Sequence, residues 1–327
     1  MRIPACMAAK GLAFALGLAV LALPLPAHAV GVNDFQARVY TNAAGKKLPY
    51  RLFVPKDYSA DRQYPLILFL HGAGERGSDN RIQVSQPERV VWADKTRQDK
   101  WPCFFVAPQC PSGQQWVDVP WSAGSGKIPA KPSASMALVM ELLPTLVKEF
   151  RIDTRRLYIT GLSMGGYGTW DLLARRPDWF AAAMPMSGGG DESIAPRICH
   201  IPIWNFHGGA DTTVPVSRSR NMIAALQKAG GTPRYTEYKG VGHDCWGKAN
   251  AEPELGPWLF SQVRAVGDLN GDAAVTSRDV VIALRCVAGL IAPADAPLWA
   301  GDLDGNGVID TLDARRILEI AAGIAVP

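Results

Sequence analysis

Residues 157–170 constrain the fold of this chain more than any other stretch. Residues 157–160 are rich in β-branched and aromatic side chains, which predicts a short buried strand. A helical pattern follows Gly165 and continues through Leu172 and Leu173. Between strand and helix, residues 161–165 have the G-x-S-x-G pattern of a nucleophile elbow. A serine on such a sharp turn needs flanking residues with almost no side chain, and the two glycines meet that need. We therefore expect Ser163 to be a nucleophile.

The chain as far as residue 265 alternates between strand-like and helix-like segments. Apolar runs typical of strands buried on both faces of a sheet occur at 52–54, 65–70, 104–107, 157–160, 182–186 and 203–206, with a further strand at 235–238. Apolar residues at a helical period predict helices at 135–150, 217–228 and 255–266. Strands that alternate with helices favour an α/β fold, with a mostly parallel sheet and helices on both faces.

Three polar residues each follow a different predicted strand, in the chain order Ser163, Asp211, His243. Chemistry in open α/β sheets gathers at the carboxyl ends of the strands, and this order is that of an α/β-hydrolase triad. In a triad the serine attacks, the histidine transfers the proton and the aspartate orients the histidine. Asp191, which follows three glycines, is a rival for the acid.

A glycine-rich turn after the second predicted strand indicates half of an oxyanion hole. A backbone N–H of this turn, from Ala73 or alternatively Gly74, is expected to stabilise an oxyanion together with the N–H of Met164. No cofactor is expected for this chemistry. Two nearby histidines, His71 and His207, are expected to be structural and to bond neighbouring turns.

Residues 110–132 are rich in Trp, Pro, Gly and Ser and follow a predicted strand. This segment is expected to form one wall of the pocket, with Trp116 and Trp121 stacking against an aromatic or sugar substrate. A loop that only covers the core fits this composition equally well. Cys110 and Cys245 follow predicted strands at the same edge of the sheet, which suggests a disulfide that fixes the histidine loop.

The first 29 residues have the features of a secretory signal peptide: a basic start, a short apolar stretch and a small-residue end at Ala29. The apolar stretch is shorter than the roughly 20 residues that span a bilayer. We therefore expect cleavage after Ala29, secretion, and no membrane association of the mature protein.

The charge of the chain, +4 overall, is unevenly distributed. From Ala265 onward there are nine acidic and four basic residues. This asymmetry predicts a boundary between a domain at 30–265 and a second one at 266–327. The basic excess of the first domain is scattered along the sequence, so a nucleic-acid partner is not expected.

Four motifs resemble those of exported bacterial esterases of the α/β-hydrolase fold, a group that includes peptidase-like, carboxylesterase-like and polyhydroxybutyrate-depolymerase-like members. The motifs are Leu-His-Gly-Ala-Gly-Glu-Arg-Gly from Leu70, Ala-Pro-Gln-Cys-Pro from Ala107, Gly-Leu-Ser-Met-Gly-Gly-Tyr-Gly-Thr-Trp from Gly161 and Gly-Val-Gly-His-Asp-Cys-Trp from Gly240. The resemblance spans residues 35–263 and implies Ser163 as nucleophile, Asp211 as acid and His243 as base. It leaves the substrate open.

The C-terminal segment contains a loop that occurs twice, beginning at Gly267 and again at Gly301. In each copy, oxygen-bearing side chains occupy positions 1, 3, 5, 9 and 12 of a calcium-binding loop, and a backbone carbonyl would serve at position 7. The predicted ligands are Asp268, Asn270, Asp272, Ala274, Thr276 and Asp279 in the first copy, and Asp302, Asp304, Asn306, Val308, Asp310 and Asp313 in the second. Helical runs follow at 280–288 and 314–322, so two Ca²⁺ ions are expected.

This segment resembles a type I dockerin, a pair of loop–helix repeats that binds cohesin modules. Ala273 stands where the first loop normally has glycine, which is expected to weaken that site. The pairs at loop positions 10 and 11, Ser277-Arg278 and Thr311-Leu312, differ from the small hydroxyl pairs of familiar cellulosomal forms. The resemblance to dockerins implies a cohesin-type partner.

These observations predict a secreted serine esterase with a calcium-binding dockerin-like domain. Feruloyl or acetyl esters on plant polysaccharide are the leading substrates by analogy with proteins that carry dockerins. Two alternatives remain: a serine peptidase of the prolyl-oligopeptidase-like type, and a non-catalytic binding protein on a hydrolase fold.

Overall fold

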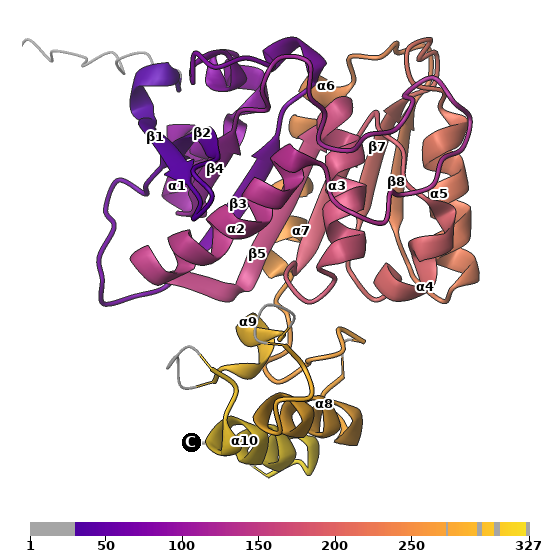
Figure 1. The fold of residues 1–327 in the computed structure, drawn as a ribbon. Coiled ribbons are helices and arrows are strands. Elements are labelled where there is room, and N and C mark those ends of the chain that lie inside the picture. The colour runs from indigo at the N-terminus through magenta and orange to yellow at the C-terminus, as the bar shows by residue number, and fades with distance from the viewer. Residues whose placement is uncertain (1–29, 273, 293–295, 304–307, 325–327) are drawn as a thin grey trace, which may run out of the picture.

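The structure is a computed structural model that describes residues 30–272, 274–292, 296–303 and 308–324 (Figure 1). The predicted signal peptide and two predicted calcium ligands, Asp304 and Asn306, lie outside the described residues. None of the described helices combines the length and the apolar character that crossing a membrane requires.

An eight-stranded sheet forms the centre of the larger domain. Its strands are β1 (Gln36–Thr41), β2 (Lys47–Phe53), β3 (Tyr64–Leu70), β4 (Phe104–Pro108), β5 (Ile152–Leu162), β6 (Ala182–Met186), β7 (Trp204–Gly208) and β8 (Arg234–Tyr238). They lie in the order β1-β2-β4-β3-β5-β6-β7-β8. β2 is antiparallel to both of its neighbours, and all other neighbouring pairs are parallel. The mostly parallel sheet predicted from the sequence is confirmed.

The helices of this domain cover both faces of the sheet (Figure 1). They are α1 (Lys95–Lys100), α2 (Ala134–Glu149), α3 (Met164–Arg175), α4 (Ala195–Ile198), α5 (Ser217–Lys228), α6 (Trp246–Asn250) and α7 (Leu255–Ser261). Alternate residues of β3 point to opposite faces: Leu66 and Leu68 join a core with residues of α2 and α3, whereas Ile67 and Phe69 join a core with residues of α6 and α7. Burial on both faces explains why β3 is apolar without interruption.

Two differences from the predicted elements have clear physical causes. The edge strand β1 is not predicted because four of its six residues are exposed and its apolar pattern is weak. The helix predicted at 255–266 ends at Ser261, since tertiary hydrogen bonds replace helical ones there. The carbonyl of Gln262 accepts from the Tyr158 hydroxyl at 2.9 Å, and the N–H of Arg264 donates to the Arg155 carbonyl at 2.9 Å.

The predicted disulfide between Cys110 and Cys245 is wrong. The five described cysteines are free thiols. Cys110 belongs to the core on the α2 side of the sheet, and Cys245 belongs to the core on the α6–α7 side. The sheet itself therefore separates the two sulfur atoms, although both residues follow strands at the same edge.

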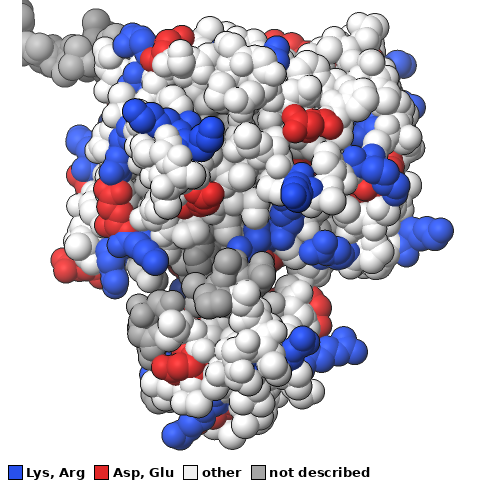
Figure 2. Space-filling view, viewed as in Figure 1, with Lys and Arg blue, Asp and Glu red and all other residues white. Residues whose placement is uncertain are grey.

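The C-terminal segment forms a small helical unit of α8 (Ser277–Val287), α9 (Leu298–Gly301) and α10 (Thr311–Ala321). Its core is small and includes Leu269, Ala283 and Ile317. The unit lies at the end of the sheet where β5 begins, the end opposite Ser163 (Figure 1). On the face drawn in Figure 2, basic side chains are interspersed with acidic ones over the larger domain, as the scattered charge of the sequence indicates.

Candidate active site

Ser163 occupies a strained turn between β5 and α3. Its φ of 54° lies in the left-handed region, which a residue with a side chain rarely adopts. The backbone N–H of Ser163 donates to the Met186 carbonyl of β6 at 2.9 Å, which holds the turn in place. A side-chain carbon at Gly165 would lie 1.8 Å from the Leu70 carbonyl oxygen, so only glycine lets α3 start this close to β3. The turn therefore presents the serine hydroxyl at the carboxyl edge of the sheet.

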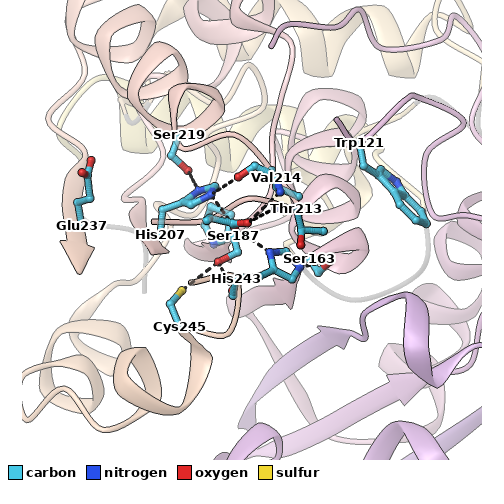
Figure 3. Close-up of polar contacts among 12 residues, drawn as sticks. Trp121, Ser163, Ser187, His207, Thr213, Val214, Ser219, Glu237, His243 and Cys245 are labelled. Atoms are coloured by element: carbon cyan, nitrogen blue, oxygen red, sulfur yellow. Dashed lines mark hydrogen bonds and ion pairs between the residues drawn. The ribbon is translucent and has the colours of Figure 1, made fainter. Parts of the chain in front are cut away.

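A continuous chain of hydrogen bonds joins Ser163, His243 and Asp211 (Figure 3). The Nε2 atom of His243 lies 2.8 Å from the Ser163 Oγ atom, and its Nδ1 atom lies 2.7 Å from the Asp211 Oδ2 atom. With its Nδ1 proton donated to the carboxylate, the neutral imidazole has a free electron pair on Nε2 to accept the serine proton. The structure thus brings together the three residues that sequence order proposes as a triad.

Asp211 is held by backbone donors on the turn after β7. Its Oδ1 atom accepts from the N–H groups of Thr213 and Val214 at 2.8 and 2.9 Å. The carboxylate is buried, and its Oδ2 atom also lies 3.1 Å from the Nε2 atom of His207. The other ring nitrogen of His207 contacts the Ser219 hydroxyl at 2.7 Å. Burial lowers the pKa of His207, which favours a neutral ring that fixes this turn.

Close backbone contact sets the histidine loop against the aspartate turn. A side-chain carbon at Gly208 would lie 1.9 Å from the Gly242 carbonyl oxygen, so the end of β7 and the loop after β8 touch directly. The Ala210 N–H donates to the Val241 carbonyl at 2.8 Å. These contacts determine where His243 stands relative to Asp211.

Sequence reasoning did not find several residues that surround His243. The Trp246 ring packs edge-on against the imidazole, with centroids 5.6 Å apart, and the Arg89 guanidinium lies over the Trp246 ring. Arg89 in turn forms an ion pair with the buried Glu75. Trp246 falls within the motif that begins at Gly240. Arg89 lies far away in sequence, and no sequence pattern indicates that it lies near His243.

The proposed oxyanion donors lie on two turns that pack together. Ala73 begins a short 3₁₀ helix, Ala73–Glu75, directly after β3. Met164 is the first residue of α3, so its N–H has no acceptor within that helix. A side-chain carbon at Gly72 would lie 2.8 Å from the Leu162 side chain, so the turn of Ala73 adjoins the nucleophile elbow. The alternative, Gly74, lies on the same turn.

His71 is entirely buried beneath this turn. Its Nδ1 atom lies 2.6 Å from the Gly72 carbonyl oxygen, and its Nε2 atom accepts from the Cys110 N–H at 2.9 Å. Burial lowers its pKa to about 4, so the ring is neutral at neutral pH. These contacts join the turn after β3 to the end of β4, which is a structural role.

The two predicted substrate-binding tryptophans differ in position. The structure contradicts the role predicted for Trp116: its side chain is 0% exposed, and its indole N–H donates to the His71 carbonyl at 3.0 Å. The loop folds back over the sheet and carries Trp116 into the core. Trp121 is partly exposed, the Arg76 guanidinium lies over its ring, and Figure 3 draws it on the opposite side of Ser163 from His207.

Asp191, the rival acid, has a different set of partners. Its carboxylate accepts hydrogen bonds from the Ser193 hydroxyl, the Lys127 ammonium group and the Ile128 N–H. These bonds join the start of the segment after β6 to the loop that carries Trp121.

The described part of the first C-terminal loop presents oxygen donors of the kind that Ca²⁺ prefers. The Asp268 carboxylate accepts from two N–H groups of its own loop, and the Asp279 carboxylate accepts from the N–H groups of Leu269, Asn270 and Thr276. Among the residues that the structure describes, no three His, Cys, Asp or Glu side chains converge closely enough to hold an ion as they stand. The donor set nevertheless fits calcium, because Asn, Thr and carbonyl oxygens complete it.

The last acidic residue of each predicted calcium loop also takes part in capping the helix that follows. Thr276 and Asp279 form a capping box at α8, and Asp310 and Asp313 form the same box at α10. Asp279 and Asp313 are both fully buried. The two repeats therefore share their local structure in the described residues, as their sequences predict.

Comparison with known proteins identifies both parts of the chain. Residues 41–266 match the family described as "Putative esterase", and residues 266–319 match the dockerin type I domain. The first match covers more than half of the chain. The chain belongs to this esterase family. The family places the protein among the carboxylic ester hydrolases, and the dockerin type I domain is of a kind that binds calcium. The resemblances drawn from the motifs are confirmed.

Three relatives illustrate the range of this family. A solved thermostable esterase is 44% identical to this chain with a TM-score of 0.67, over 71% of this chain and 64% of the other. The "Probable feruloyl esterase C" of Aspergillus niger is 25% identical over 196 residues, which are 57% of this chain and 63% of that protein. A bifunctional acetylxylan esterase/xylanase of Neocallimastix patriciarum is 25% identical over 180 residues, 55% of this chain and 23% of that protein. This chain spans less than two thirds of each.

Proposed function

We propose that this protein is an exported serine esterase that removes acyl groups, feruloyl or acetyl, from plant polysaccharide. The observation that carries the proposal is the hydrogen-bonded series Ser163–His243–Asp211, with contacts of 2.8 and 2.7 Å, on a strained serine turn. The relatives named for feruloyl and acetylxylan ester hydrolysis support the choice of substrates.

The reaction follows from the roles of these side chains. The Ser163 Oγ atom attacks the acyl carbon while the His243 Nε2 atom accepts the serine proton, and His243 then protonates the departing alcohol. Asp211 stabilises the imidazolium that forms in between. The N–H groups of Ala73 and Met164 would hold the negative oxygen of the tetrahedral intermediate. Water, activated by His243, then hydrolyses the acyl-enzyme and restores the serine.

We assign the Trp121 side chain to the wall of the acyl-binding site. Its partly exposed indole ring and the cation of Arg76 suit a flat aromatic acyl group such as a feruloyl chain. This assignment belongs to the same proposal and has its own test below.

The dockerin domain would attach the enzyme to a cohesin-type partner, and two Ca²⁺ ions would stabilise it. The first ion would be held by Asp268, Asn270, Asp272, Thr276 and Asp279 with the Ala274 carbonyl, and the second by the corresponding residues of the second loop. When bound, Ca²⁺ neutralises the clustered carboxylates and ties each loop to its helix. Cleavage after Ala29 and secretion belong to the same proposal.

The test combines active-site labelling with a panel of esters. A fluorophosphonate should label the wild-type chain at Ser163 and should not label the Ser163→Ala variant, whose ester turnover should fall at least about a thousandfold. Aryl, acetyl, feruloyl and hydroxybutyrate esters and a matched anilide should then be compared. Faster hydrolysis of the anilide would make the protein a peptidase, and failure to label Ser163 would favour a binding protein.

A further inference from the structure

Ser187, which follows β6 directly, is entirely buried and has an unusual backbone conformation. Its φ is 43°, and among the described residues only Asn80 and Ser163 share a positive φ without being glycine. Such a conformation is costly and persists only where the surrounding structure enforces it. Two adjacent strands thus end in a strained serine at the same edge of the sheet: β5 at Ser163 and β6 at Ser187.

The contacts of Ser187 reach both sides of the candidate site. Its hydroxyl donates to the carbonyl oxygen of His243 at 2.9 Å, and its N–H donates to the Phe206 carbonyl of β7 at 2.9 Å. The residue before it, Met186, accepts the N–H of Ser163 at 2.9 Å. The dipeptide Met186–Ser187 therefore links the backbone of the serine turn to the backbone of the histidine loop. Figure 3 shows the contact between Ser187 and His243.

Tight packing prevents this dipeptide from shifting. A side-chain carbon at Gly188 would lie 2.6 Å from the Gly166 carbonyl carbon, so the turn is in direct contact with the start of α3. The His243 carbonyl has a second donor, the Cys245 N–H at 3.1 Å, and the Cys245 sulfur atom lies 3.1 Å from the Ser187 hydroxyl. Removal of the hydroxyl would leave the carbonyl with the weaker, local bond alone.

We propose that Ser187 is a positioning residue whose hydroxyl holds the backbone of His243 in the place from which the imidazole reaches Ser163. The inference rests on the proposed esterase function. The reacting groups must be aligned closely, because a displacement of about 1 Å can reduce a rate about 100-fold.

The decisive variant is Ser187→Gly. Glycine adopts a positive φ without strain, so this change removes the hydroxyl and relieves the backbone. We expect kcat to fall about 10- to 100-fold with little change in KM. Ser187→Ala, which keeps the strain, should lose kcat to a similar extent. If the backbone conformation were the whole role of this residue, Ser187→Gly would keep its kcat.

Thr160→Val is a matched control. The Thr160 hydroxyl is buried and donates to the Met184 carbonyl of β6 at 2.9 Å, and within the described residues it forms no hydrogen bond with the histidine loop. Loss of the Thr160 hydroxyl should lower the stability about as much as the Ser187 variants do, and it should leave kcat near the wild-type value. Thermal unfolding of all variants checks that they are folded.

A second readout does not depend on turnover. The Nδ1 proton shared by His243 and Asp211 should give a far-downfield proton resonance, assigned by its loss in His243→Gln. This resonance should move or broaden in Ser187→Gly and stay unchanged in Thr160→Val. An unchanged resonance in Ser187→Gly, or an equal change in both variants, would overturn the inference. If the wild-type chain showed no ester turnover while the resonance still changed in Ser187→Gly, the esterase function would be refuted and the positioning role of Ser187 would stand.

Discussion

Asp211 and Asp191 are both buried aspartates that follow neighbouring strands, but their partners differ. Asp211 contacts two histidine rings and two backbone N–H groups, whereas Asp191 bonds the loop at Lys127 and Ile128. A carboxylate that orients a catalytic histidine must touch that histidine. The geometry therefore favours Asp211 as the acid of the proposed triad.

This assignment predicts opposite results for two conservative variants. Asp211→Asn should lower kcat about 10³- to 10⁴-fold, because an amide favours the wrong histidine tautomer and cannot stabilise the imidazolium. Asp191→Asn should keep kcat near the wild-type value and affect mainly KM through the loop it anchors. Steady-state kinetics on an aryl ester measures both. The reverse pattern would move the acid to Asp191.

His71 leads to a prediction about pH. Burial holds its pKa in the folded state at about 4, below the 6.5 of an unperturbed histidine, so the unfolded chain takes up the proton first as pH falls. The stability associated with its neutral ring is complete above pH 6.5 and is lost progressively towards pH 4. The difference of about 2.5 pH units corresponds to at most about 3 kcal/mol.

Urea unfolding of the hydrolase domain between pH 7 and 4.5 tests this sign. As the pH is lowered, the free energy of unfolding should decrease more steeply in the wild-type chain than in His71→Gln. The glutamine amide can still donate to Gly72 and accept from Cys110, but it does not titrate in this range. A lower absolute stability of the variant does not affect the test, because only the slopes of unfolding free energy against pH are compared. Equal slopes would show that His71 does not carry this dependence.

At the scale of elements, the loop between β4 and α2 has a fixed shape without regular secondary structure. The Tyr167 hydroxyl of α3 donates to the Trp121 carbonyl at 2.7 Å, and the Arg218 guanidinium of α5 donates to the Ala123 and Gly190 carbonyls. Arg175 donates to carbonyls of residues 129–131. Side chains of two helices thus replace the backbone pairing that the loop lacks, and they fix the position of Trp121.

Trp121→Ala should therefore change substrate preference more than chemistry. We expect kcat/KM for a feruloyl ester to fall about tenfold or more, since an aromatic contact is worth about 1 kcal/mol beyond its buried area. For an acetyl ester, which is too small to reach the ring, the change should be slight. Trp116→Phe serves as the contrast: it should lower stability through the lost bond to His71 and leave the ratio of the two substrates unchanged. A uniform loss for both substrates in Trp121→Ala would contradict a specific acyl wall.

On the scale of the whole molecule, the sheet carries the chemistry at one end and the dockerin domain at the other. The N–H of Arg264 bonds the start of β5, and the calcium loop at Gly271 approaches His200 of the hydrolase domain. Neither contact involves Ser163, Asp211 or His243. A domain of this size with a small core depends on more than apolar burial, and its buried carboxylates repel one another without a cation.

Chelation of Ca²⁺ should therefore unfold the dockerin domain and leave the activity of the hydrolase domain unchanged. EDTA added to the full chain should expose residues 266–327 to limited proteolysis and reduce the helical signal, while hydrolysis of a small ester continues at the original rate. Ca²⁺ should restore resistance, and Mg²⁺ should do so poorly because it demands a smaller octahedral site. Loss of hydrolysis on chelation, or a protease-resistant domain in EDTA, would refute this division of roles.

Patterns that repeat along the chain were predicted well. The apolar runs of β3 and β6, the glycines of the elbow and the oxygen spacing of the two C-terminal loops are local, and the same physics acts on them in any fold. The proposed triad could be ordered from sequence because each member follows a strand, and parallel strands bring their carboxyl ends to one edge.

Tertiary structure decided the features that depend on the direction of a side chain. Trp116 and Trp121 have the same composition around them, yet Trp116 turns into the core, whereas Trp121 stays partly exposed beneath the Arg76 guanidinium. Cys110 and Cys245 share an edge of the sheet but lie on opposite faces of it. Ser187 contacts His243, and Arg89 contacts Trp246, across long separations in sequence, and no local pattern encodes such contacts. The sequence by itself thus determined the family, the fold and the order of the chemical groups, because these follow from periodicity and motif. Which groups touch was decided only when the sheet and its loops packed together.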